Sequence, residues 1–89
     1  MASVRLCNNG DNAICVMVEP LGEDFWIVSG QTLTFAVPDE IPTVTWHENG
    51  PEVWGNEGDP DDIVVTTMTG EVVECGYQRP PGAFGTSSS

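Results

Sequence analysis

The sequence contains no lysine, and only Arg5 and Arg79 oppose its 14 acidic residues, so the formal net charge at pH 7 is −12. Proteins that bind DNA or RNA neutralise phosphates with lysine and arginine, so we expect no nucleic-acid partner. Anionic membrane surfaces are disfavoured for the same reason. A basic protein surface, or divalent cations, would be attracted. The alternative is that the charge only keeps a small β-protein soluble and protects its sheet edges.

Long hydrophobic runs are also missing. No segment approaches the ~20 apolar residues of a membrane-spanning helix. The N-terminal residues, MASVRLC, lack the apolar core of a signal peptide. We therefore expect a cytoplasmic or virion location, with no membrane contact.

The number and spacing of the cysteines disfavour a disulfide framework and a zinc site. Cys7, Cys15 and Cys75 are odd in number, and their spacing fits no zinc pattern. We expect three reduced thiols in a reducing compartment, each serving as a small apolar residue of a strand. A disulfide between Cys7 and Cys15 across a first hairpin is the alternative.

Catalytic motifs are absent as well. The chain has no phosphate-binding loop, dinucleotide fingerprint, metalloprotease helix or Gly-x-Ser-x-Gly elbow. His47 is the only histidine, and we expect Glu52 opposite it across a hairpin. Such a pair can be a general base and its orienter, but an ordinary cross-strand contact is the preferred interpretation. We expect no enzyme, although a Cys–His nucleophile pair stays open.

A loop rich in carboxylates, GNEGDPDD at residues 55–62, is the one stretch with the ligand chemistry of calcium. It lacks the EF-hand pattern. A solvated acidic loop is therefore preferred to a calcium site, and we expect no metal and no cofactor.

What the sequence does contain is a series of short alternating apolar runs. Residues 24–37, DFWIVSGQTLTFAV, alternate on both sides of a turn at 29–31, which predicts a hairpin that pairs Phe25 with Phe35. A three-residue loop ending in Gly70 predicts the last hairpin. Pro51 is expected in a loop, because it lacks the N–H that a ladder requires. Further strands are expected at 3–7, 13–19, 43–47, 63–67 and 71–75, with one more beginning at Glu52.

Apolar residues on both faces of 13–19 predict a central strand or one covered on both sides. Together the runs predict one all-β domain over residues 1–77, a small antiparallel β-sandwich or closed barrel of about 7–8 short strands. Residues 78–89 are rich in Pro, Gly and Ser and are expected to form an extended C-terminal tail.

An E-P-x-G-E segment, followed by a glycine turn and a W-x-x-x-G hairpin, resembles a group of short, uncharacterised bacterial β-proteins. The resemblance covers about half of the chain. Its motifs are turns, so it implies a β fold and no activity. The residues that carry it are Glu19, Pro20, Gly22, Glu23, Gly30, Trp46 and Gly50.

The leading functional hypothesis is a non-enzymatic acidic protein–protein interaction module, an accessory or structural component of a larger assembly such as a phage particle. The alternative is an acidic inhibitor or immunity protein that mimics nucleic acid and docks on a basic protein. Exposed aromatic residues can anchor a partner, although a second covered face, or simple core packing of the tryptophans, is the competing interpretation. The candidate partner-binding residues are Trp26, Trp54, Glu48, Glu52, Glu57, Asp59, Asp61, Asp62 and Phe84.

Overall fold

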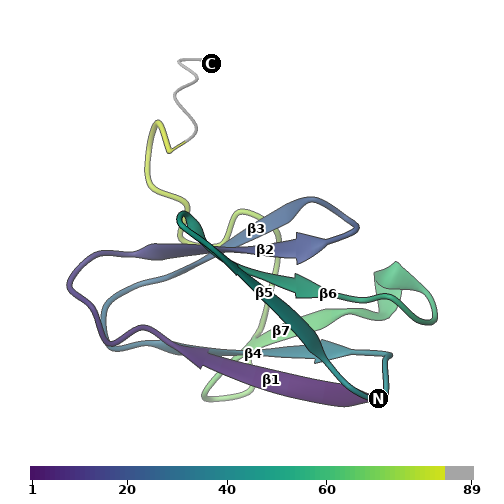
Figure 1. Ribbon diagram of the computed structural model, residues 1–89. Coiled ribbons are helices and arrows are strands. Elements are labelled where there is room, and N and C mark those ends of the chain that lie inside the picture. Colours follow the sequence, from purple (N-terminus) through teal and green to yellow (C-terminus); the bar gives the residue numbers. More distant parts are fainter. Residues whose placement is uncertain (84–89) are drawn as a thin grey trace.

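A computed structural model of the chain describes residues 1–83 and shows two four-stranded β-sheets packed face to face (Figure 1). The predicted all-β sandwich is therefore confirmed. One sheet has the order β1-β4-β7-β8 and the other β3-β2-β6-β5. The elements are β1 (Ala2–Cys7), β2 (Ile14–Glu19), β3 (Glu23–Ile27), β4 (Thr32–Val37), β5 (Thr43–His47), β6 (Gly50–Trp54), a 3-10 helix η1 (Pro60–Asp62), β7 (Val64–Thr67) and β8 (Val72–Val73). No helix among these residues is long and apolar enough to cross a membrane.

The core forms where the alternating residues of the two sheets meet. In β4, Leu33, Phe35 and Val37 are buried and the residues between them are half-buried. Phe25 faces Phe35 from the opposite sheet, with the ring centroids 6.0 Å apart in an edge-to-face arrangement. Burying each such side chain stabilises the fold by roughly 1.5–3 kcal/mol. The period-2 pattern therefore accounts for the two inner faces.

The predicted hairpin over residues 24–37 is wrong. β3 pairs with β2, and β4 pairs with β1 and β7. The turn carries the chain from one sheet to the other, because β3 and β4 belong to different sheets. Within it, Gly30 donates its N–H to the carbonyl of Asn8 at 2.7 Å. Alternation identified the buried face correctly, but it does not say which strand lies alongside.

The expected first hairpin is also wrong, because β1 and β2 lie in different sheets. No disulfide joins Cys7 to Cys15, and all three thiols are free. Asn8, which is buried, holds this crossover: its side-chain amide donates to the carbonyls of Asn12 and Ile27, both at 2.7 Å. Cys7 and Cys75 are exposed, so the expectation that each cysteine serves as a small apolar residue of a strand is wrong for these two.

The strand 14–19 is central, as predicted, with β3 on one side and β6 on the other. The pairing of β2 with β6 is parallel, with Val18 beside Val53. The sandwich is therefore not wholly antiparallel. This parallel pair joins segments far apart in the sequence, and local patterning carries no signal for it.

The last hairpin is confirmed. Val65 pairs with Val73, and Gly70 has the expected left-handed conformation, with φ of 87°. In the β5–β6 hairpin, by contrast, the predicted register is wrong: His47 lies opposite Gly50, and Pro51 pairs with Trp46 inside the ladder. The turn contains only residues 48 and 49, because Gly50 adopts a φ of 126° that few other residues tolerate.

Hydrogen bonds to the domain extend past the expected boundary at residue 77. Tyr77 forms a bridge with Phe25, and the side-chain amide of Gln78 donates to the carbonyl of Trp26 at 2.9 Å. Arg79 binds Asp24. Residues 75–79, called the closing segment below, thus lie along the free edge of β3.

Candidate functional site

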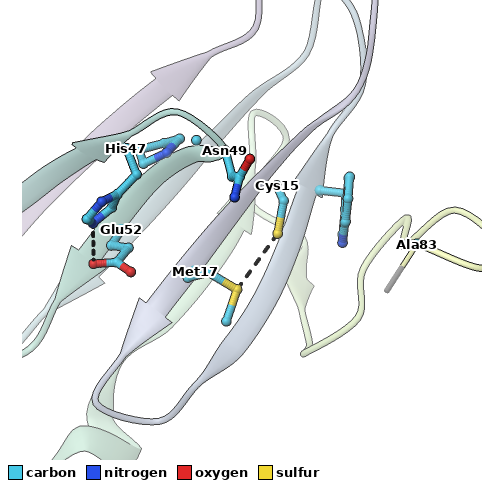
Figure 2. Close-up of a pocket in the computed structure, with 9 residues that line it drawn as sticks. Cys15, Met17, His47, Asn49, Glu52 and Ala83 are labelled. Carbon is cyan, nitrogen blue, oxygen red and sulfur yellow. Dashed lines mark hydrogen bonds and ion pairs between the residues drawn. The ribbon is translucent and has the colours of Figure 1, made fainter. Parts of the chain in front are cut away.

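A groove of about 700 Å³ lies on the outer face of sheet β3-β2-β6-β5, near the turn between β5 and β6 (Figure 2). It arises from the alternation in β2, whose inward residues are buried while Cys15 and Met17 point outward. We call it the outer groove. Its lining residues are Cys15, Met17, Trp26, His47, Asn49, Gly50, Pro51, Glu52 and Ala83.

The expected contact between His47 and Glu52 is confirmed. Nε2 of His47 lies 3.0 Å from Oε1 of Glu52 (Figure 2). Because Thr45 is directly opposite Glu52, His47 reaches the carboxylate diagonally across the hairpin. The His47 side chain is half exposed, so the contact contributes little to stability, below roughly 1 kcal/mol.

Cys15 lies in the same groove as His47, which raises the question of a thiol–imidazole pair. The Cys15 thiol donates to Sδ of Met17 at 3.8 Å, whereas His47 is bonded to Glu52. Burial, and secondly the carboxylate of Asp24, raise the pKa of the Cys15 thiol from 9.0 to about 11. A nucleophilic cysteine requires the opposite shift. The groove therefore holds a protonated thiol and no activated one.

Beside the groove, Asp24 forms the one carboxylate–guanidinium pair of the described residues. Arg79 binds it with two hydrogen bonds, Nε to Oδ2 at 2.7 Å and Nη2 to Oδ1 at 2.6 Å. Trp26 adds a third from its indole nitrogen at 2.8 Å. The Arg79 guanidinium above all holds the pKa of the buried Asp24 carboxyl well below its usual range. This cluster fixes the closing segment on β3 and orients Trp26 at the groove.

The structure brings only part of the predicted partner-binding set together. Trp26 and Glu52 line the outer groove, and Trp54 shares its sheet face because it alternates with the buried Val53. Glu48 belongs to the exposed turn after β5. Phe84 lies outside the described residues.

The remaining predicted acids form a separate group. Figure 1 shows the β5–β6 turn and the η1 loop at opposite ends of β6. The predicted acidic residues are thus divided between the two ends of β6. The members at the η1 end, all exposed, are Glu57, Asp59, Asp61 and Asp62.

Hydrogen bonds explain the shape of this acidic loop. The buried carboxylate of Asp39 accepts the N–H groups of Asn56 and Glu57 at 3.0 and 3.1 Å. Asp59 caps η1 by accepting the N–H of Asp61 at 2.9 Å. Within residues 1–83, no group of three or more His, Cys, Asp or Glu side chains is placed to hold a metal ion.

Sequence reasoning missed Asp24 and Arg79. A buried carboxylate is normally paired, but nothing in the sequence marks Asp24 as buried or Arg79 as its partner. Comparison of the chain with protein-family profiles, curated proteins and solved structures finds no match. Functional inference therefore depends on the chemistry of the groove and its surroundings.

Proposed function

We propose that the protein is a non-enzymatic interaction module that binds a basic protein surface with the outer face of sheet β3-β2-β6-β5. The outer groove is the observation that supports it. Met17 and Trp26 line it beside the carboxylate of Glu52, on a chain with a net charge of −12. Methionine and tryptophan are enriched at protein interfaces, and tryptophan is a common hot-spot residue. A larger assembly, such as a phage particle, is the setting that we propose for such a module.

The state of Cys15 supports the non-enzymatic part of the proposal. A pKa of about 11 instead of 9.0 lowers the thiolate fraction at neutral pH by roughly 100-fold. We expect iodoacetamide at pH 7.5 to alkylate Cys7, which is exposed, before Cys15. Mass spectrometry of the individual cysteines measures this, and preferential labelling of Cys15 would favour the enzyme hypothesis.

Affinity capture from the native source tests the interaction itself. Met17→Arg places a cation in the groove and should reduce retention of a basic partner by about tenfold. Val72→Arg makes the same charge change at an exposed position of the other sheet and should leave retention unchanged. Retention by the wild-type protein should fall between about 50 and 300 mM salt. Equal retention by the two variants would contradict docking at this face.

The exposed acids around η1 support a second candidate function, an acidic inhibitor that docks on a basic protein. None of these four carboxylates has an ion pair within the described chain. The double substitution Asp61→Asn and Asp62→Asn leaves the Asp59 cap intact. Loss of capture by this variant, with capture retained by Met17→Arg, would favour the inhibitor over the groove-docking module.

A further inference from the structure

Three of the four sheet edges are protected in ways that are common in natural β-proteins. β8 has only two residues. β1 carries the exposed cation Arg5. The free edge of β3 is covered by the closing segment, since the Trp26 N–H donates to the Tyr77 carbonyl at 2.9 Å and the Gly76 N–H donates to the Asp24 carbonyl at 2.7 Å. Short, charged or covered edges discourage the addition of further strands.

β5 has none of these protections. It is five residues long, TVTWH, and contains no proline, acidic residue, lysine or arginine. Its register with β6 is continuous, so no bulge interrupts it. Four of its five residues are exposed, and the Trp46 side chain has 68% of its surface accessible. Within residues 1–83, no strand covers its outer side.

The backbone groups of β5 can be oriented from its neighbours. The Gly55 N–H donates to the Glu19 carbonyl at 2.9 Å, which shows that the odd-numbered residues around β6 direct their backbone groups toward β2. Val53 and Pro51 therefore do not bond to β5. Their partners Val44 and Trp46 form the non-hydrogen-bonded pairs of the antiparallel ladder. The N–H and C=O groups of these two residues thus point away from the sheet.

We propose that the β5 edge takes an extended segment of a basic protein as an added strand, with apolar residues alternating with lysine or arginine. Its apolar side chains would lie beside Val44 and Trp46. Its cations would lie over the short Thr45 side chain, toward Glu52. The inference deepens the proposed function and rests on it, because it assigns how the basic partner is held.

Charge decides between the candidate occupants. A second copy of this chain would bring another −12 to the same edge. A basic segment meets the opposite sign there, and strand addition supplies affinity through main-chain hydrogen bonds. The basic segment is therefore the occupant that we assign.

The test uses a probe of this chemistry, the peptide acetyl-Val-Arg-Val-Arg-Val-Arg-amide, measured by calorimetry with the whole chain. A twin peptide carries N-methyl groups on the valine amides, which removes strand hydrogen bonds and keeps the charge. We expect the methylated peptide, and Val44→Pro with the unmodified peptide, each to bind about tenfold more weakly. Val72→Ala, at an exposed apolar position of the other sheet, should bind as wild type does. Peptide binding should also slow hydrogen exchange at the Trp46 amide.

Several outcomes would overturn the proposal. Equal binding of the two peptides would show that charge alone attracts them. An absence of peptide binding would also overturn the proposal. So would a wild-type dimer that Val44→Pro dissociates, because a second copy would then occupy the edge. If Met17→Arg abolishes partner capture while Val44→Pro leaves both capture and peptide binding intact, the interaction module stands and the added strand is wrong.

Discussion

The two edges of sheet β3-β2-β6-β5 differ in how they are covered. At the β3 edge, the closing segment makes main-chain hydrogen bonds and Arg79 clasps the buried Asp24. At the β5 edge, Val44 and Trp46 direct their backbone groups away from β6, and the described chain places no strand on that outer side. Within residues 1–83, one of the two arginines thus helps to close the β3 edge, whereas the β5 edge has no Asp, Glu, Lys or Arg and no covering strand. Since open edges promote association, the β5 edge is where a partner is to be sought.

Gly50→Ala should have the largest effect, because it detaches the open-edge hairpin from the sheet. A Cβ on Gly50 would lie 2.4 Å from the carbonyl oxygen of Cys15, at a φ of 126°. We expect a loss of at least about 3 kcal/mol in the free energy of unfolding, from backbone strain and the clash together. Urea unfolding measures it.

Gly22→Ala is the matched control for this substitution. Gly22 also has a positive φ, of 69°, but no atom lies within 4 Å of its Cβ position. It should lose only about 1 kcal/mol. Equal losses for the two variants would show that the hairpin does not depend on the close approach of Gly50 to β2.

Asp24→Asn should open the covered edge. The substitution keeps the shape of the side chain and removes the charge that Arg79 binds. Because Arg79 is partly exposed, we expect a loss of roughly 2 kcal/mol, below the 3–5 kcal/mol of fully buried pairs. Hydrogen exchange at the Trp26 amide should accelerate as its bond to Tyr77 opens, while exchange in β5 stays unchanged. Asp11→Asn, at an exposed turn position, should alter neither quantity.

The pH dependence of stability tests the same ion pair at the covered β3 edge. The pKa of Asp24 is lowered from its ordinary value of 3.8 in the folded state, chiefly by Arg79. A lowered folded pKa contributes stability above the unfolded pKa, and this contribution is lost as pH falls below it. The difference in unfolding free energy between wild type and Asp24→Asn should therefore be constant from about pH 5 to 8 and shrink below about pH 4. A difference that is independent of pH down to about 2 would contradict the charge pairing.

Local patterning predicted the strands but not their partners. The TLTFAV run of β4 and the loop ending in Gly70 each specify a strand face or a turn within a few residues, and both are as predicted. Phe25 and Phe35 were correctly placed on one core, yet they face each other from two sheets. Side-chain alternation reports burial, whereas pairing depends on where distant segments meet, as in the parallel contact of β2 with β6.

The candidate site, like the fold, could be predicted only in part. Trp26 and Glu52 could be proposed from residue type alone, and the His47–Glu52 contact survived a two-residue error in register, because both side chains remain on one face. The role of Asp24 could not be predicted, since its partner Arg79 is 55 residues away in the sequence. The open edge was equally hidden, because the sequence of β5 does not say that β6 is its one partner strand within residues 1–83.

The smallest effect on stability is expected from Trp46→Thr, which probes the open edge without disturbing the sheet. The Trp46 side chain is mostly exposed and threonine suits a strand, so the free energy of unfolding should change by no more than about 0.5 kcal/mol. Binding of the alternating valine–arginine peptide should nevertheless fall severalfold, because an apolar anchor is lost while the backbone groups remain. Val72→Thr should alter neither measurement. A loss of stability above about 1 kcal/mol in Trp46→Thr would show that this tryptophan supports the fold, and that its exposure is not a binding feature.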